Sequence, residues 1–387
     1  MKNIFVLILL LILTSCYEPS QYESSAASKN NTASSDFGVI YEVNGGKQIC
    51  NPSVSLDTVN FPASMLWLNF SGTLNVTSAP KGYSTSGAGE HDRLTVSDTA
   101  GKVLWYVMKD SVPGVECEFQ DPEWSTSADY IVALGGFKAK GSPSCDDDKD
   151  YGIVAIRPSD KASFFLIDSG MEEIANPHLW VGGLQASVDS TDSLQLFFGT
   201  DQVKLVYVTA AGKIAFIDYA TSAKANTLVL PDSTKGNLLD SPLISPDGNW
   251  VVYDVLDGSY SWKSYIQELS TTAEPVEISK TSDMISNPVF PHWWEFGNRL
   301  FVVWAEFASG LSYLNKSDLT NSSTWDYSVG RTAMREVELT AGAPKDVAVE
   351  WVSDVRELAP IPFIGGRSPD GHFLATGTNN GYLLNLP

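Results

Sequence analysis

Short runs of apolar and β-branched residues alternate with turn signals along most of the chain. The runs recur about every ten residues and are separated by Gly, Pro, Asn and Asp, as in YGIVAIRP, ASFFLID and RLFVVWAEF. Two longer runs contain a hairpin turn in which Gly101 or Gly212 stands where a positive φ is expected. The best helix candidate, residues 331–339, also fits a strand. The pattern predicts an all-β protein.

A longer repeat is superimposed on these strands. Each copy has a polar or small residue followed by proline, an apolar or aromatic step, a turn and an apolar strand. Copies begin at Asp121, Asn176, Ser241, Asn287 and Ile361, of which the last departs from the pattern at its first residue, and a degenerate sixth copy is expected near residues 61–72. The spacings of 55, 65, 46 and 74 residues indicate a repeat architecture with loops of variable length.

The repeat fits a blade of a β-propeller. Proline would begin the innermost strand, where no N–H is needed, and SPDG at residues 245–248 would form a tight turn. Since one blade cannot cover both of its own faces, blades in a ring cover one another. Six copies predict six blades of four antiparallel strands. The last copy ends after three strands, so we expect residues 37–43 to complete it and close the ring.

Two windows carry a more specific resemblance. SPLISPDGNWVVYD (residues 241–254) and RSPDGHFLATG (residues 367–377) resemble the repeat of TolB-type propellers, whose consensus is close to sPxwSPDGxxIxf. The resemblance covers five short windows, of which these two match well. It implies a periplasmic interaction platform, in which loops on the faces of the ring form the binding site because the blades are occupied with packing.

The chain begins with the pattern of an exported lipoprotein. Lys2 precedes a short apolar run at residues 4–13, which is too short for a stable spanning helix. Leu-Thr-Ser-Cys at residues 13–16 resembles the lipobox of bacterial lipoproteins, so we expect residues 1–15 to be a signal peptide and Cys16 to be lipidated. An ordinary secretory signal is the alternative. Tyr17, where Asp would favour the inner membrane, favours the outer membrane.

The remainder divides into a tether and one domain. Residues 16–36 are rich in Ser, Asn and Ala, which predicts a flexible tether, and residues 37–387 are expected to form a single propeller. The net charge of −21 argues against nucleic acid and against electrostatic docking on anionic lipid. We expect a monomer held at the bacterial envelope by its lipid, with an envelope protein or a glycan as its partner.

Three cysteines remain after Cys16, and an exported protein can form disulfides. In the propeller scheme Cys117 precedes the copy at Asp121, and Cys145 lies in the loop between strands two and three of the same blade. Both positions belong to one face of the ring, so a Cys117–Cys145 disulfide is expected, with Cys50 left over or competing as a partner.

The loop after Cys145 carries acidic residues at alternate positions. Asp146, Asp148 and Asp150 supply the hard oxygen ligands that Ca²⁺ takes, although the spacing departs from an EF-hand. An acidic solvent loop is the alternative, and no other cofactor is suggested.

No motif for catalysis is present. The four histidines form no HExxH, and GYSTSG at residues 82–87 has Ser86 where a nucleophile elbow needs Gly, so no catalytic residue is nominated. Aromatic residues near two of the repeats form the candidate ligand site instead, where exposed indoles can stack on sugars or peptides. These residues are His178, Trp180, His292, Trp293 and Trp294. The alternatives are core tryptophans and structural histidines in the channel.

Two functions follow from these observations. The first is a non-enzymatic lipoprotein whose propeller binds a protein or ligand at the envelope. The second is a surface propeller that binds or cleaves glycans, with paired carboxylates at the mouth of its channel. The sequence leans toward the first, because no carboxylate stands in a distinctive context.

Overall fold

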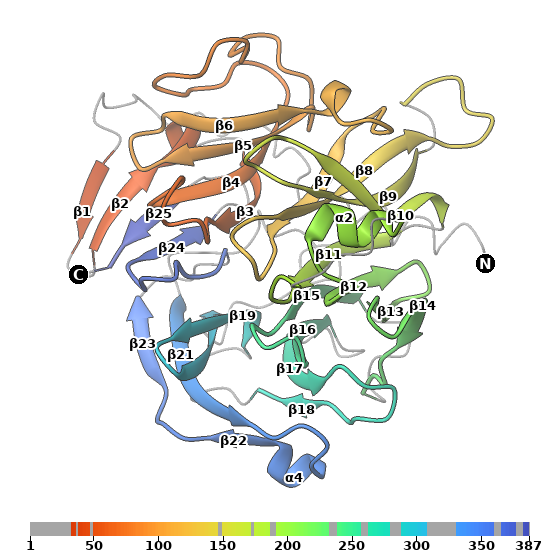
Figure 1. The fold of residues 1–387 in the computed structure, drawn as a ribbon. Coiled ribbons are helices and arrows are strands. Elements are labelled where there is room, and N and C mark those ends of the chain that lie inside the picture. Colours follow the sequence, from red (N-terminus) through yellow and green to blue (C-terminus); the bar gives the residue numbers. More distant parts are fainter. Residues whose placement is uncertain are drawn as a thin grey trace.

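In the computed structural model, six antiparallel sheets are arranged in a ring around a channel (Figure 1). The structure describes residues 32–35, 38–46, 49–145, 149–171, 174–185, 191–231, 238–256, 262–278, 288–307, 330–359, 365–376 and 382–386. These sheets confirm the prediction of an all-β propeller with six blades.

Five blades are built from consecutive strands that run outward from the channel. Blade 1 has β3 (Ile49–Val54), β4 (Ser64–Asn69), β5 (Arg93–Asp98) and β6 (Val103–Met108). Blade 2 has β7 (Phe119–Trp124), β8 (Ile131–Lys138), β9 (Lys149–Ile156) and β10 (Ser163–Met171). Blade 3 has β11 (Ile174–Val181), β12 (Val203–Thr209), β13 (Lys213–Asp218) and β14 (Ser222–Thr227).

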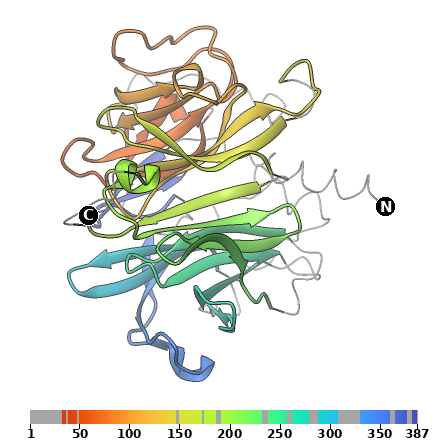
Figure 2. The same cartoon turned by 45° about the vertical axis from the view of Figure 1, so that its right-hand side comes forward.

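Blade 4 has β15 (Leu238–Ile244), β16 (Trp250–Leu256), β17 (Trp262–Glu268) and β18 (Val276–Glu277). Blade 5 has β19 (Val289–Phe296), β20 (Arg299–Phe307), β21 (Gly330–Leu339) and β22 (Val349–Trp351), and β23 (Arg356–Ala359) also pairs with β21. Short helices occur in the connections: η2 (Val43–Gly46), η3 (Lys109–Ser111), α2 (Ser193–Phe198) and α4 (Lys345–Ala348). In the turned view, α2 lies in light green at the ends of the blade 3 strands (Figure 2).

The two ends of the described chain share blade 6. β24 (Phe373–Thr376) and β25 (Tyr382–Asn385) pair with each other, and β2 (Gly38–Glu42) then pairs with β25, opposing Val39 to Asn385. β1 (Thr32–Ser35) adds a further strand outside β2 (Figure 1). The predicted closure of the ring by an N-terminal strand is confirmed, whereas Ile361, the first residue of the last repeat copy, lies outside the described residues.

In blades 1 to 5 the proline of the repeat lies inside the inner strand, not at its beginning. The register shifts between Cys50 and Ser53, and again at the corresponding point of β7, β11, β15 and β19. The residue before each proline has a φ between 44° and 52°; these residues are Asn51, Asp121, Asn176, Ser241 and Phe290. The prediction that proline begins the innermost strand is therefore wrong. Proline is accommodated at these positions because a β-bulge tolerates a missing N–H as well as a strand end does.

The bulges also correct the register of two repeat copies. In blade 5 the bulge falls at Phe290-Pro291 and not at Pro288, whose preceding residue lies outside the described part of the chain. In blade 1 it falls at Asn51-Pro52, whereas residues 61–72 cover the turn into β4 and β4 itself. The repeat unit is therefore the X-Pro dipeptide at the bulge, whatever residue X is.

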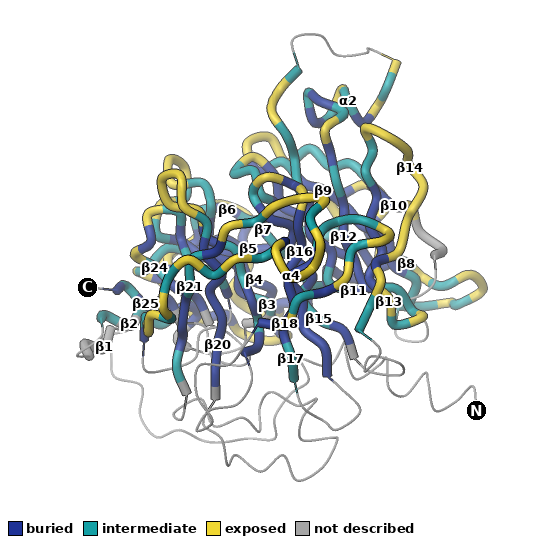
Figure 3. Tube along the Cα trace, turned by 90° about the horizontal axis from the view of Figure 1, so that it is seen from below, coloured by how far each residue is buried: buried dark blue, intermediate teal, exposed yellow. Residues whose placement is uncertain are grey.

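The hydrophobic core lies between blades. Each of six clusters of buried apolar side chains joins two neighbouring blades, including blades 6 and 1 across the closure. The second strand of a blade, counted from the channel, contributes most to these clusters. All seven residues of β16, for example, are buried. Buried stretches consequently follow the inner strands of the blades, whereas turns and the outermost strand β14 are exposed (Figure 3). This explains why near-continuous apolar runs, rather than strict alternation, mark these strands.

Closure of the ring requires glycine at position 38. Gly38 has a φ of 146°, and an added Cβ would collide with the carbonyl oxygen of Asn385 in β25. We expect Gly38→Ala to lower the free energy of unfolding by about 1–3 kcal/mol, which urea denaturation measures. Gly183→Ala is the matched control, because nothing lies within 4 Å of its added Cβ. Equal stability of the two variants would contradict this account of closure.

Candidate functional site

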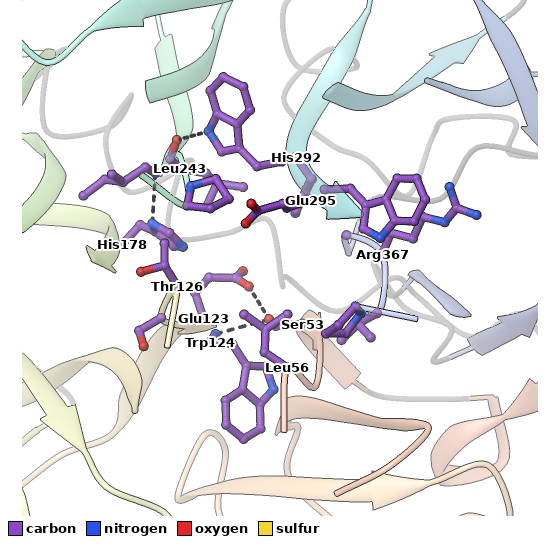
Figure 4. Close-up of a pocket in the computed structure, with 18 of the residues that line it drawn as sticks. Ser53, Leu56, Glu123, Trp124, Thr126, His178, Leu243, His292, Glu295 and Arg367 are labelled. Carbon is purple, nitrogen blue, oxygen red and sulfur yellow. Dashed lines mark hydrogen bonds between the residues drawn. The ribbon is translucent and has the colours of Figure 1, made fainter. Parts of the chain in front are cut away.

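The bulges place one side chain from each of five blades around the channel. The residue after each X-Pro dipeptide is, in chain order, Ser53, Glu123, His178, Leu243 and His292. All five line one pocket of about 320 Å³ (Figure 4). Further lining residues, such as Trp124, Ile244 and Glu295, come from the ends of inner strands, so the pocket lies where those strands leave the channel.

A belt of hydrogen bonds lies beneath the pocket. Asn51 Nδ2 donates to Asp121 Oδ1 (2.6 Å), while Asn176 donates from its amide N to Asp121 Oδ2 (3.0 Å) and from Nδ2 to Asp240 Oδ1 (2.8 Å). The belt thus joins four consecutive blades. Burial raises the pKa of Asp121, and raises the pKa of Asp240 to about 6 with help from the nearby Asp121 charge.

The two histidines are held neutral by burial, with opposite tautomers. Burial lowers the pKa of His178 to about 3, aided by His292, and burial lowers the pKa of His292 to about 4. His178 Nδ1 accepts from the amide of Ile244 (2.9 Å), so its proton is on Nε2. His292 Nδ1 faces the carbonyl of Phe290 (3.0 Å) and must donate, which leaves Nε2 as an acceptor.

Glu123 faces the pocket as an uncharged acid. The hydroxyl of Ser53 donates to Glu123 Oε1 and so links blades 1 and 2. Burial raises the pKa of Glu123 to about 8, and hydrogen bonds from Ser53 and the Trp124 amide only partly oppose this effect. At neutral pH the carboxyl group is therefore protonated and can donate a hydrogen bond.

The tryptophans of the candidate site fasten neighbouring blades together. Trp180 Nε1 donates to the carbonyl of Pro246 (2.8 Å), and Trp294 Nε1 donates to that of Ser368 (3.0 Å), so each meets the SPDG turn of the next blade. Trp294 is 8% exposed, with the Arg367 guanidinium 3.8 Å from its ring centre. Trp293 and Trp294 line the pocket, whereas Trp180 is not among the lining residues.

The SPDG turns leave room for these indoles. Gly248 and Gly371 have φ values of 74° and 78°, as the turn requires. A Cβ on Gly248 would also collide with the ring of Trp180, and one on Gly371 would lie 2.7 Å from Trp294. Trp294 is thus buried and Trp180 is partly buried, and each indole packs against the turn of a neighbouring blade.

Sequence reasoning missed Glu123, Trp124 and Glu295. The signal that identifies Glu123 is its place two residues after Asp121, which matches the place of His178 relative to Asn176. The equivalence of these positions is seen only when the repeats are aligned on the X-Pro dipeptide at the bulge. We aligned blade 5 on Asn287 instead, which hid the equivalent position of His292.

The other sequence-predicted residues lie away from the pocket. A disulfide joins Cys117 and Cys145, with their Cα atoms 5.4 Å apart. Because Cys117 precedes β7 and Trp124 ends it, this bridge and the pocket lie at opposite ends of the channel. Cys16 lies outside the described residues, and the structure does not describe the side chain of Cys50.

No metal site can be assigned in the described part of the chain. Asp150 lies in β9 opposite Phe137, while Asp146 and Asp148 lie outside the described residues. Among the residues that the structure describes, no group of three or more His, Cys, Asp or Glu side chains is placed to hold a metal ion. Within the same ranges, no helix is both long and apolar enough to cross a membrane.

Comparisons with known proteins show weak likenesses only. No protein-family model and no curated protein sequence matches the chain. TolB from Acinetobacter baumannii is 13% identical with a TM-score of 0.43, over 76% of this chain and 59% of TolB, less than two thirds of its length. An oligogalacturonate lyase in complex with manganese is 12% identical (TM-score 0.40; 88% of this chain, 78% of the lyase).

An α-L-arabinofuranosidase from Fusarium graminearum is 13% identical with a TM-score of 0.44, over 92% of this chain and 98% of that enzyme. Identities and TM-scores this low carry no argument about function. The assignment of a propeller rests on the six sheets themselves.

The protonated Glu123 makes the stability depend on pH. Its folded-state pKa of about 8 exceeds its ordinary value of 4.5, so the stability it contributes is fully present below pH 4.5 and is lost as the pH rises through about 8. We expect the free energy of unfolding to fall more steeply between about pH 5 and about pH 9 in the wild type than in Glu123→Gln, measured by urea denaturation.

Glu336→Gln is the control for this slope. The ion pair with Arg299 lowers the pKa of Glu336, so its titration lies at more acidic pH and the wild-type slope should remain. The interpretation fails if Glu123→Gln shows the same slope as the wild type.

Proposed function

We propose that this protein is a lipid-anchored lipoprotein of the bacterial cell envelope whose propeller is a non-enzymatic binding module. The pocket at the end of the channel is its recognition site. The proposal rests on one observation: residues at equivalent positions of five blades line one concave site. Glu123, His178 and His292 are the polar titratable residues among them.

The pocket has the properties of a binding site prepared in advance. Its volume of about 320 Å³ falls in the range of ligand sites, and apolar groups such as Leu243 and Trp293 alternate with a few polar ones. The belt through Asn51, Asp121 and Asn176 holds the inner strands beneath it. A preformed floor reduces the ordering cost of binding.

Anchoring and location rest on the sequence. Cys16 would carry the lipid, residues 17–36 would act as the tether, and the outer membrane is the favoured location. The partner is an envelope protein or a glycan, and the net charge of −21 disfavours nucleic acid. We propose a monomer that uses no cofactor.

A pull-down from detergent-solubilised envelopes tests this function. The full chain should fractionate with membranes and Cys16→Ser should not. The wild type should also retain a stoichiometric envelope component, and Ala128→Trp should reduce its recovery about tenfold, because Ala128 lines the pocket and an indole there would block it.

Val347→Trp is the matched control, since Val347 is 60% exposed on α4 and does not line the pocket. Thermal denaturation shows whether both variants are folded. Full recovery of the component by a folded Ala128→Trp would contradict a recognition role for the pocket.

Glycan cleavage is the second candidate, and one observation favours it. Glu123 of blade 2 and Glu295 of blade 5 both point into the pocket (Figure 4). Glycoside hydrolysis uses two carboxyl groups, one of them protonated as the general acid, and the raised pKa of Glu123 suits that role. Glu295 is exposed at the rim and would serve as base or nucleophile.

Release of reducing ends from a panel of envelope and plant polysaccharides tests cleavage. An active wild type should lose at least about a hundredfold in rate on either Glu123→Gln or Glu295→Gln. The Glu338→Gln control should keep full activity, because Glu338 in β21 does not line the pocket. Cleavage that survives both pocket substitutions, or no cleavage at all, would eliminate this candidate.

A further inference from the structure

The pocket and the turns beside it expose apolar surface at one end of the ring. Apolar side chains such as Val54, Leu243 and Trp293 supply much of the lining, and they come from the inner strands of three blades. Two large side chains next to the pocket face solvent: Val59, in the turn after β3, is 85% exposed, and Phe296, which ends β19, is 53% exposed. Uncovered apolar groups around a concave site indicate a surface that is buried against a partner.

An acidic rim surrounds this apolar surface. In five of the six blades, a carboxylate residue either lines the pocket or directly follows a residue that lines it. The residues of the acidic rim are Asp57, Asp129, Asp247, Glu295 and Asp370. None of them forms an ion pair with a residue that the structure describes. The mouth of the pocket therefore carries negative charge that the described chain leaves uncompensated.

The acids of the rim fall into two groups. Asp57, Asp247 and Asp370 accept hydrogen bonds from backbone amides of their own turns, which accounts for an acid at those positions. Asp129 and Glu295 are exposed, and their carboxylates accept no hydrogen bond within the described ranges. They belong to blades 2 and 5, which are opposite each other in a ring of six. A ligand that crosses the pocket would thus meet one carboxylate on each side.

Cations in the same turns, or next to them in the sequence, already have partners. Arg367 lines the pocket, but its guanidinium stacks on an indole and donates from Nε to Gly371 O (2.8 Å). Arg299 Nε donates to Glu336 Oε1 (2.7 Å), and Lys204 Nζ donates to a carbonyl of the SPDG turn of blade 4 (2.7 Å). The five carboxylates of the acidic rim exceed the one arginine that lines the pocket, so the mouth attracts cations.

We propose that the pocket docks a basic segment of a polypeptide. One apolar side chain of the segment would enter the pocket, and lysines or arginines on either side of it would lie against Asp129 and Glu295. A second copy of this chain would bring its own acidic rim against this one, and an anionic membrane would meet the same repulsion. An apolar anchor provides affinity, and complementary charges around it steer the partner. The inference rests on the proposed function, because it names the partner class of the same site.

Fluorescence anisotropy with the full chain, in a non-ionic detergent, tests the proposal on short labelled peptides. The probes are lysine-rich peptides with Leu, Phe or Trp at the centre. One comparison peptide has Ser at the centre, and another has Glu in place of every Lys. At least one probe should bind at least about tenfold more tightly than both comparison peptides. Added NaCl should weaken this binding, because salt screens exposed charges.

Two double variants separate the acidic rim from the overall charge of the chain. Asp129→Asn combined with Glu295→Gln should weaken binding of the basic peptide about fivefold, because two carboxylates of the rim are lost. Glu338→Gln combined with Glu350→Gln is the matched control, since these exposed acids of β21 and β22 do not line the pocket and the net charge changes equally. Equal affinities of the two double variants would overturn the role of the rim.

Other results would overturn the docking of a basic segment. These are absence of binding by every basic peptide, equal affinity for basic and acidic peptides, and equal affinity for apolar and Ser centres. Binding that Ala128→Trp leaves unchanged would also do so, because the anchor would then lie outside the pocket. A concentration-dependent dimer in sedimentation, lost in Ala128→Trp, would show that a second copy is the occupant.

These failures remain distinct from failure of the proposed function. An envelope component that Ala128→Trp loses in the pull-down, without a preference for basic peptides, would keep the recognition role of the pocket and exclude a basic polypeptide as its partner. Full recovery of the component by a folded Ala128→Trp would contradict the recognition role itself.

Discussion

No blade of this protein can bury both of its own faces, and the rest of the structure depends on that constraint. Six apolar clusters each need side chains from two neighbouring blades, so the blades are stable only in a closed ring. Closure joins β2 to β25 across nearly the whole chain length. The apolar strands, the N-terminal strand and Gly38 are consequences of this requirement.

The ring also determines where chemistry can occur. The faces of the blades are buried against one another. Side chains that a ligand can contact therefore lie where the inner strands leave the channel. The bulge at each X-Pro dipeptide brings Ser53, Glu123, His178, Leu243 and His292 to this place from separate blades. A pocket of mixed chemistry thus arises from repeats that share one backbone geometry but differ in one side chain.

Three side chains that the bulges bring to the pocket, Glu123, His178 and His292, are uncharged at neutral pH, in contrast to the net charge of −21 of the chain. Burial accounts for the difference, because it raises the pKa of Glu123 and lowers those of His178 and His292. A charged surface keeps its hydration, whereas groups at the channel end avoid the desolvation cost by remaining uncharged. The excess of carboxylates therefore lies on hydrated surfaces, such as the acidic rim, and not in these three side chains.

The sequence by itself determined the strands, the number of blades and the closure. These depend on local signals: apolar runs, SPDG turns and recurring X-Pro steps, together with a final repeat that lacks one strand. It also grouped His178 with His292, since both stand beside tryptophans near a repeat. Loop positions in the propeller scheme were enough to bring Cys117 and Cys145 to one face, where the structure joins them.

Only the tertiary structure decided the register of blade 5 and the composition of the pocket. NPVFP offers two X-Pro steps, and the pairing of β19 with β20, together with the hydrogen bond from the Phe290 amide to Asp254 Oδ2 (2.5 Å), places the bulge at the second. Glu123 became a site residue because Ser53, 70 residues earlier, lies beside it in the ring. Local sequence does not encode such distant contacts, nor the burial that sets the pKa of Glu123.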